Sequence, residues 1–157
     1  MRTLLSIVVA AALLAQDDLI KFEAPKEWTK ETPASNMRKA QYKVPDKEKQ
    51  AKDAELTLFY FGKNAGGIDA NIKRWAGQMG QTEAKPETIE GKCKITLVDI
   101  KGTYSERPNQ PPLENARMLA AVVATDNGPW FFKLVGPADT VGDWREELIK
   151  LLKDAAP

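Results

Sequence analysis

The sequence predicts an α+β fold, an α/β/α sandwich in which a largely antiparallel sheet of about six strands has a helix on each side. Several short segments are apolar on both strand faces, as strands covered on two sides are. Two amphipathic helical patterns lie far apart in the chain, at 68–79 and 141–152. Most connections between the expected strands are shorter than a parallel crossover requires, so neighbouring strands are expected to run antiparallel.

The N-terminal segment, residues 1–15, has the composition of a signal peptide. Arg2 supplies a positive charge, and residues 4–14 are apolar except for Ser6. This apolar run is too short to span a bilayer but suits the core of a cleavable signal. The sequence therefore predicts an exported protein, periplasmic or extracellular, with no stable membrane span once the signal is removed.

Two cleavage positions are open, after Ala12 and after Ala15. We favour Ala15, which leaves a longer apolar core and makes residues 16–157 a single domain. N-terminal sequencing of the exported protein should therefore find Gln16 first. An intact Met1 on the exported protein would contradict the assignment.

Composition excludes several classes of site. The chain has no histidine and one cysteine, which rules out Ser-His-Asp and Cys-His catalysis, histidine-ligated zinc and multi-cysteine metal sites. Its 23 basic and 22 acidic residues nearly balance, and nothing indicates binding to nucleic acid or to an anionic membrane. We therefore predict a protein without a cofactor and without enzyme activity. The cysteine, Cys93, shares strand parity with aliphatic residues and is expected to be buried and inert.

The first half of the domain is expected to contain three strands. Residues 19–23 form a short one, and residues 37–44 alternate as a half-exposed strand near a sheet edge. Residues 45–53 are a charged loop. Residues 55–61 are apolar on both faces, which is typical of an interior strand.

The first helix follows a loop at 62–67. Apolar residues recur at helical spacing from Ile68 to Met79 and place Trp75 on the inner face. Asp69 lies in the first turn, where an acid favours the helix dipole. Gly80 is a suitable terminator.

Residues 82–86 form a linker before a long strand, 92–104. Its apolar residues change from one face of the strand to the other between Leu97 and Val98. This indicates either a bulge or a strand covered by different neighbours at its two ends. Residues 105–115 contain three prolines and are expected to be the longest irregular segment and a mobile surface loop.

A hairpin and a helix close the domain. Apolar runs at 118–123 and 130–135 flank Asn127-Gly128, a strong signal for a turn between antiparallel neighbours. The helical pattern that follows has Trp144 on its inner face, and Thr140-x-x-Asp143 resembles a capping box. We expect all four tryptophans to be core residues.

The order of these elements resembles the PsbP-type (Mog-like) sandwich. Local strings resemble more closely a group of uncharacterised exported bacterial proteins of that fold, and they describe packing and turns, not catalysis. These strings are Gly66-Gly67, Asn71-Ile72-x-Arg74-Trp75, Lys101-Gly102-Thr103-Tyr104, Trp130 to Pro137, and Val141 with Trp144. The resemblance implies varied roles, because one branch assists photosystem II, another binds a Ran-type GTPase, and others are periplasmic or lipid-anchored.

The most plausible contact surface is the proline-rich loop at 105–115. The candidate partner-contact residues are Tyr104, Arg107 and Asn109, in or beside this loop, and Arg74 in the expected helix at 68–79. Loops on a rigid scaffold often carry binding residues. The sequence thus favours a non-catalytic accessory or protein-binding domain of the cell envelope, whose partner is another envelope or secreted protein.

Two other functions are weighed against this one. A carrier of a small apolar ligand would hold it between sheet and helix, in a pocket lined by Trp75, Trp144 and Phe132. A carboxylate-dependent hydrolase would need two acids that converge in a cleft. The acid pairs on offer are Asp17 with Asp18, Asp139 with Asp143, and Glu146 with Glu147.

Overall fold

The computed structural model describes residues 20–157, and one seven-stranded sheet forms their centre, in the order β1-β2-β3-β7-β6-β5-β4. Every neighbouring pair is antiparallel. The predicted α+β class and antiparallel sheet are confirmed, although the strands number seven and not about six. The predicted signal peptide lies outside the described residues.

In chain order the elements are β1 (Thr29–Glu31), β2 (Arg38–Val44), β3 (Ala54–Tyr60), the 3-10 turn η1 (Gly62–Asn64), α1 (Ile68–Gln78), β4 (Glu87–Glu90), β5 (Lys94–Tyr104), β6 (Leu113–Val123), β7 (Trp130–Pro137), α2 (Ala138–Asp143) and α3 (Arg145–Asp154).

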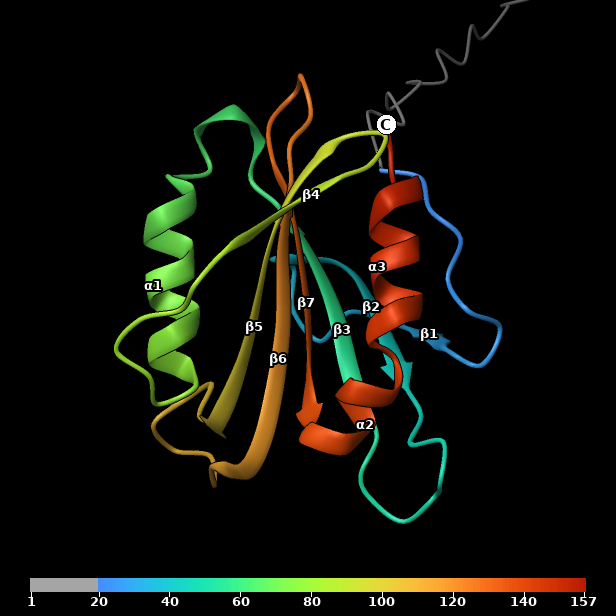
Figure 1. Cartoon of the computed structure of the whole chain (residues 1–157), viewed down its shortest axis with the longest axis vertical. Helices are drawn as coiled ribbons and strands as arrows, with labels where there is room; N and C mark the ends of the chain where they lie inside the picture. The colour runs from blue at the N-terminus through green and yellow to red at the C-terminus, as the bar shows by residue number, and fades with distance from the viewer. Residues whose placement is uncertain (1–19) are drawn as a thin grey trace, which may run out of the picture.

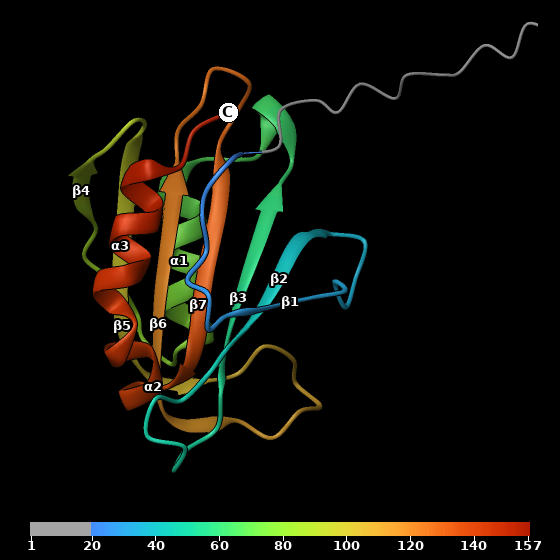
Figure 2. The same ribbon diagram turned by 90° about the vertical axis from the view of Figure 1, so that its right-hand side faces the viewer.

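The helices lie on both sides of this sheet, as the sequence predicts. Helix α1 covers one face, and α2 and α3 lie at the other (Figures 1 and 2). We call these the α1 face and the α3 face. Each face has its own core because successive side chains of a strand point to opposite sides. Phe132 belongs to the core of the α3 face and Phe131 to that of the α1 face.

The closing hairpin is confirmed. Strands β6 and β7 pair from Ala116↔Pro137 to Val123↔Trp130, and Gly128 adopts a φ of 116° in the turn between them. Strand β7 also pairs with β3, so it lies at the centre of the sheet. This position explains its continuous apolar sequence, since both of its faces are covered.

The change of parity in β5 does not come from a bulge. The register runs without a break from Ile95 to Gly102, and the irregularity falls between Gly102 and Tyr104. Leu97 packs in the core of the α3 face and Val98 in that of the α1 face. The second interpretation, a strand covered by different neighbours, therefore describes it.

The sequence patterns misplace the edges of the sheet. The predicted strand at 19–23 makes only an isolated bridge, Lys21↔Ala156, among the described residues. Short, polar strands β1 and β4 form the two edges instead, and neither carries enough apolar residues to show alternation. Strand β6 begins at Leu113, so the loop after β5 covers 105–112 and is shorter than the loop at 45–53.

The final helix is interrupted at Trp144, which separates α2 from α3 and has φ −106° and ψ 6°. The predicted capping box is wrong. Pro137 precedes α2 and makes no side-chain cap bond, while the Thr140 hydroxyl donates to the carbonyl of Lys52 at 3.0 Å. This bond ties the helix to the loop before β3.

All four tryptophans are buried, as predicted: Trp28, Trp75, Trp130 and Trp144. Cys93 is only partly buried and packs against the core of the α3 face. Within residues 20–157, no helix combines the length and the apolar character that a membrane span requires.

Candidate functional site

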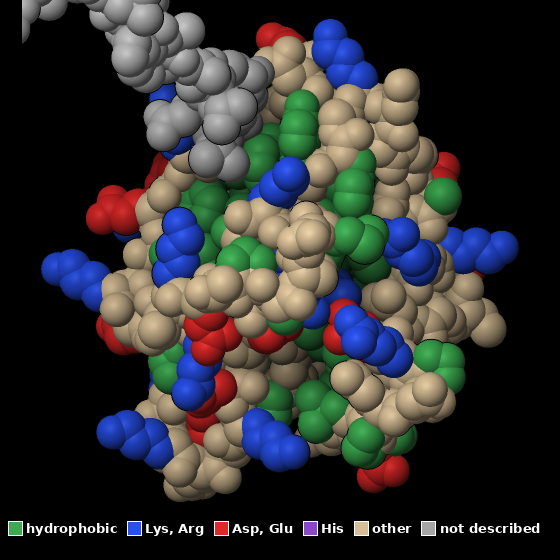
Figure 3. Space-filling view, turned by 180° about the vertical axis from the view of Figure 1, so that it is seen from behind, with side chains coloured by type: hydrophobic (Ala, Val, Ile, Leu, Met, Phe, Trp, Pro, Cys, Tyr) green, Lys and Arg blue, Asp and Glu red, His purple; other side chains and the backbone are tan. Residues whose placement is uncertain are grey.

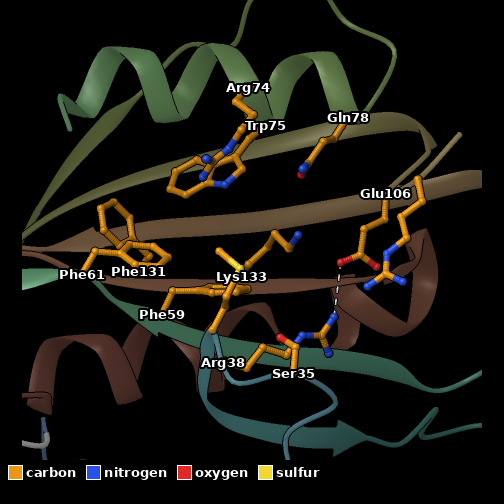
Figure 4. A pocket seen from close by; sticks show the side chains of 12 residues that line it. Ser35, Arg38, Phe59, Phe61, Arg74, Trp75, Gln78, Glu106, Phe131 and Lys133 are labelled. Atoms are coloured by element: carbon orange, nitrogen blue, oxygen red, sulfur yellow. Dashed lines mark hydrogen bonds and ion pairs between the residues drawn. The ribbon is translucent and has the colours of Figure 1, made fainter. Parts of the chain in front are cut away.

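Helix α1 leaves part of its own face of the sheet uncovered. The helix packs against β5, and beside it a pocket with a volume of about 310 Å³ opens over β3 and β7. The loop at 105–112 closes one end of this pocket and the segment before β2 another. Figure 4 shows Arg74, Trp75 and Gln78 descending from α1 toward the sheet. We call this the α1 pocket.

Aromatic rings form one wall of the α1 pocket. Phe59 and Phe131 are register partners on β3 and β7, and Phe61 continues the row. The centroid of the Phe61 ring lies 6.2 Å from that of Phe59 and 6.1 Å from that of Phe131. Trp75 meets Phe131 edge to face at 6.2 Å.

This wall reaches the molecular surface. Phe61 is 45% exposed and Met37, at the rim, is 63% exposed. Seen from behind, hydrophobic side chains show between groups of lysine and arginine side chains (Figure 3). An open apolar surface beside a concave site is typical of an interaction site.

Lys133 lies at the base of the pocket and is only 6% exposed. Its Nζ is 3.3 Å from the Tyr104 hydroxyl, and it lies 5.5 Å from the Tyr104 ring centroid and 6.0 Å from that of Phe59. Among residues 20–157, no carboxylate forms a salt bridge with it. Burial lowers the pKa of the Lys133 ammonium from its ordinary value, and the attraction of Glu106 only partly opposes this.

Arg38, in contrast, has its charge compensated. Its guanidinium lies 2.8 Å from a carboxylate oxygen of Glu55 and 3.2 Å from one of Glu106, and it also donates to the Gln41 side-chain oxygen at 2.8 Å. The dashed line in Figure 4 marks the contact with Glu106. Arg38 therefore fastens the loop at 105–112 to strands β2 and β3.

Three further polar side chains line the pocket. Arg74 donates to the Asn71 side-chain oxygen at 2.8 Å, and neither Arg74 nor Arg107 forms a salt bridge within the described residues. The side-chain oxygen of Gln78 is buried without a hydrogen-bond partner. The pocket thus offers hydrogen-bond donors with positive charge, one unused acceptor and an aromatic wall.

The structure brings some of the predicted contact residues together. Arg74 and Arg107 line the pocket, and the Tyr104 hydroxyl is the hydrogen-bond partner of Lys133, at 3.3 Å. Asn109 is exposed on the same loop but does not line the pocket. A role for these four residues in partner contact stays a prediction.

Sequence reasoning missed Arg38, Lys133 and the phenylalanine wall. One signal was available, because Lys133 is the charged residue in the apolar run from Trp130 to Val135. A charge inside a strand covered on both faces needs an explanation. The phenylalanines gave no such signal, since core packing accounts for them equally well.

The pocket predicted for a carrier does not exist in the predicted form. Trp75 lies on the α1 face, whereas Trp144 and Phe132 lie on the α3 face. The whole sheet separates them, so they cannot line one cavity.

The predicted acid pairs do not form a joint site. Glu146 contacts Arg145 at 3.2 Å and Glu147 contacts Lys47 at 3.1 Å, while Asp139 and Asp143 are exposed. Asp17 and Asp18 lie outside the described residues. From 20 to 157, no group of three or more cysteine or acidic residues is arranged to hold a metal ion.

Replacing Lys133 with methionine should raise the free energy of unfolding by about 1–3 kcal/mol at neutral pH, because it removes a buried charge and keeps the side-chain length. The unfolded chain keeps this proton up to its ordinary pKa of 10.5, while the folded chain releases it at lower pH. The destabilisation of the wild-type protein by the buried ammonium is therefore complete below the folded pKa and disappears as pH rises toward 10.5.

Urea denaturation at several pH values measures this effect, and the gain should shrink as the pH rises. Exposed Lys150 provides the control, since Lys150→Met should change the free energy of unfolding by less than about 0.5 kcal/mol. A loss of stability in Lys133→Met would show that the ammonium supports the fold.

Comparisons with known proteins give a fold but no family. No known protein family matches the sequence, and no curated protein matches it. The solution structure of cyanobacterial PsbP (CyanoP) from Synechocystis sp. PCC 6803 is similar, with a TM-score of 0.55 and 11% sequence identity. The match covers 87% of this chain and 85% of that one. The predicted PsbP-like fold is confirmed, while the resemblance to exported bacterial proteins stays a prediction.

Proposed function

We propose that this chain, a domain of PsbP-like fold, is exported and acts as a non-catalytic accessory domain that binds another protein of the cell envelope through the α1 pocket. The observation that carries the proposal is the pocket's composition. An aromatic wall that ends in the exposed Phe61 adjoins a buried lysine that forms no salt bridge within the described residues. A similar fold does not carry a function across.

The pocket is suited to binding because it is preformed. Its wall stands on β3 and β7, two central strands paired over six positions, and side chains on such strands are held more precisely than side chains on loops. Arginine is among the residues that most often dominate binding energy at protein interfaces, and phenylalanine is enriched there. Binding therefore requires little loss of conformational entropy from the side chains of this wall.

A carrier of a small apolar ligand is the second candidate, because about 310 Å³ lies near the lower limit of ligand pockets. The ammonium of Lys133 speaks against a purely apolar cargo. Such a ligand would displace water from the lysine and supply no hydrogen bond in return, which is costly. A protein partner can place an apolar side chain against the aromatic wall and a polar group beside Lys133.

Site-specific photo-crosslinking in the native envelope tests the proposal. A photoreactive phenylalanine analogue replaces Phe61, whose ring lies at the exposed rim. We expect a discrete crosslinked partner after irradiation. The same analogue at Lys150, exposed on α3, is the matched control and should give no such product. No product from position 61, or the same product from both positions, would contradict a binding role for the pocket.

A further inference from the structure

We propose that the α1 pocket recognises the C-terminal residue of its partner, with Lys133 binding the chain-terminal carboxylate and the phenylalanine wall holding a large apolar side chain. The inference rests on the proposed function and specifies the chemistry of the partner. It follows from four features of the pocket: a buried cation without a salt bridge among the described residues, an excess of positive charge in the lining, an apolar wall, and an unused acceptor.

Lys133 is the first feature. An ammonium has three hydrogen-bond donors, and the structure gives Lys133 one hydroxyl partner, Tyr104 at 3.3 Å. A buried cation in this condition is costly unless an anion pairs with it. A carboxylate that enters the pocket would form charge-assisted hydrogen bonds with the remaining donors, which are stronger than bonds between neutral groups.

The charge balance of the pocket also favours an anion. Its lining contains four cationic side chains, Arg38, Arg74, Arg107 and Lys133, and one carboxylate, Glu106. Arg38 already binds that carboxylate together with Glu55. The charges of Arg74, Arg107 and Lys133 therefore remain to attract a negative group.

The apolar half of the pocket distinguishes a chain end from an internal acid. An aspartate or glutamate presents its carboxylate on a short stem and brings no large apolar group to Phe59, Phe61 and Phe131. A C-terminal residue carries a carboxylate and an apolar side chain on the same carbon atom, so it meets both halves. A volume of about 310 Å³ is enough for one such residue.

Gln78 supplies a further match. Its side-chain oxygen is buried and accepts no hydrogen bond, and it lines the same pocket as Lys133. The last residue of a peptide has a backbone N–H next to its terminal carboxylate. This N–H is a donor of the kind that the Gln78 oxygen lacks in the free protein.

Binding of labelled peptides to the purified full-length protein tests the inference. The probe is a flexible hexapeptide ending in phenylalanine with a free carboxylate, and its partner probe is the same peptide as a C-terminal amide. Fluorescence anisotropy should show binding of the acid and a loss of about tenfold or more for the amide, since a charge-assisted contact is removed. N-acetylphenylalanine carries the carboxylate, the ring and the N–H of the last residue, so it should compete with the hexapeptide for the pocket.

Two variants assign the contact to Lys133. Lys133→Met should weaken binding of the acid by about tenfold or more, with little effect on the amide, while Lys150→Met leaves both unchanged. The unfolding midpoint is measured first, so a misfolded variant is recognised, and the comparison of acid with amide on the wild-type protein needs no variant. Affinity for the acid should fall as pH rises through the folded pKa of Lys133, because the neutral amine attracts no anion.

Equal binding of acid and amide, or no binding of either, would overturn the inference. If N-acetylphenylalanine failed to displace the hexapeptide, the last residue would not be the part that the pocket binds, and the inference would be wrong. A crosslinked partner from position 61 would in each case leave the proposed function standing. Absence of that crosslink would instead remove the proposed function itself.

Discussion

Replacing Trp144 with alanine should lower the free energy of unfolding by about 3–5 kcal/mol, the usual cost of removing a large aromatic side chain from a core. Trp144 is 4% exposed and separates α2 from α3. Its indole N–H donates to the Pro45 carbonyl at 2.6 Å, and its ring meets Trp28 edge to face at 5.7 Å. The alanine variant loses all of these contacts and leaves a cavity under the helix junction.

Chemical denaturation followed by circular dichroism measures this loss. Trp144→Phe is the matched control, because it keeps an aromatic ring against Trp28 and removes the indole donor to the Pro45 carbonyl. We expect it to cost less, about 1–3 kcal/mol, since a buried acceptor then lacks its bond. A loss below about 1 kcal/mol for Trp144→Ala would show that the junction does not depend on this residue.

The second large effect is expected at Gly102, near the end of β5. A methyl group at this position would overlap the carbonyl oxygen of Met79, at the end of α1. Two hydrogen bonds beside this contact hold the end of α1 against β5. The Ser105 amide donates to the backbone carbonyl of Gln78 at 2.8 Å, and the Gln81 side-chain amide donates to the backbone carbonyl of Lys101 at 3.0 Å. Gly102→Ala should therefore force α1 away from the sheet and lower the free energy of unfolding by about 3 kcal/mol.

The same substitution at Gly77 should have the opposite sign. Gly77 lies in α1 and is exposed, and a methyl group there would meet no atom within 4 Å. Alanine favours a helix over glycine, so Gly77→Ala should raise the free energy of unfolding by about 0.5–1 kcal/mol. Denaturation curves of the two variants measure both changes. Equal changes in the free energy of unfolding would refute the close approach at Gly102.

Much of the fold could be predicted where one face pattern dominates. Strands β3, β6 and β7 are long and apolar enough to show that both faces are covered, and α1 has a clear helical stripe. The edges could not be predicted, because β1 and β4 are short and take their conformation from pairing with β2 and β5. The break of the final helix at Trp144 could not be predicted either, because Trp144 itself continues the apolar stripe of the helical pattern.

The candidate site could be predicted only in part, for a related reason. Arg107 stands out in the sequence because it is a charged residue in an expected surface loop, and Arg74 because it neighbours Trp75. The contact of Arg38 with Glu106 joins residues 68 positions apart, and no local pattern records such a pairing. The phenylalanine wall forms because β3 and β7 become neighbours, which the sequence indicates only through the general expectation of a covered sheet.

The alternation along β7 separates the core of the α3 face from the α1 pocket. Trp130, Phe132 and Leu134 build the core of the α3 face, while Phe131 and Lys133, on the opposite side, line the α1 pocket. Substitutions at these two odd-numbered positions can alter the chemistry of the pocket and leave the larger core untouched. Binding preference can therefore change at these positions while the core of the α3 face stays as it is.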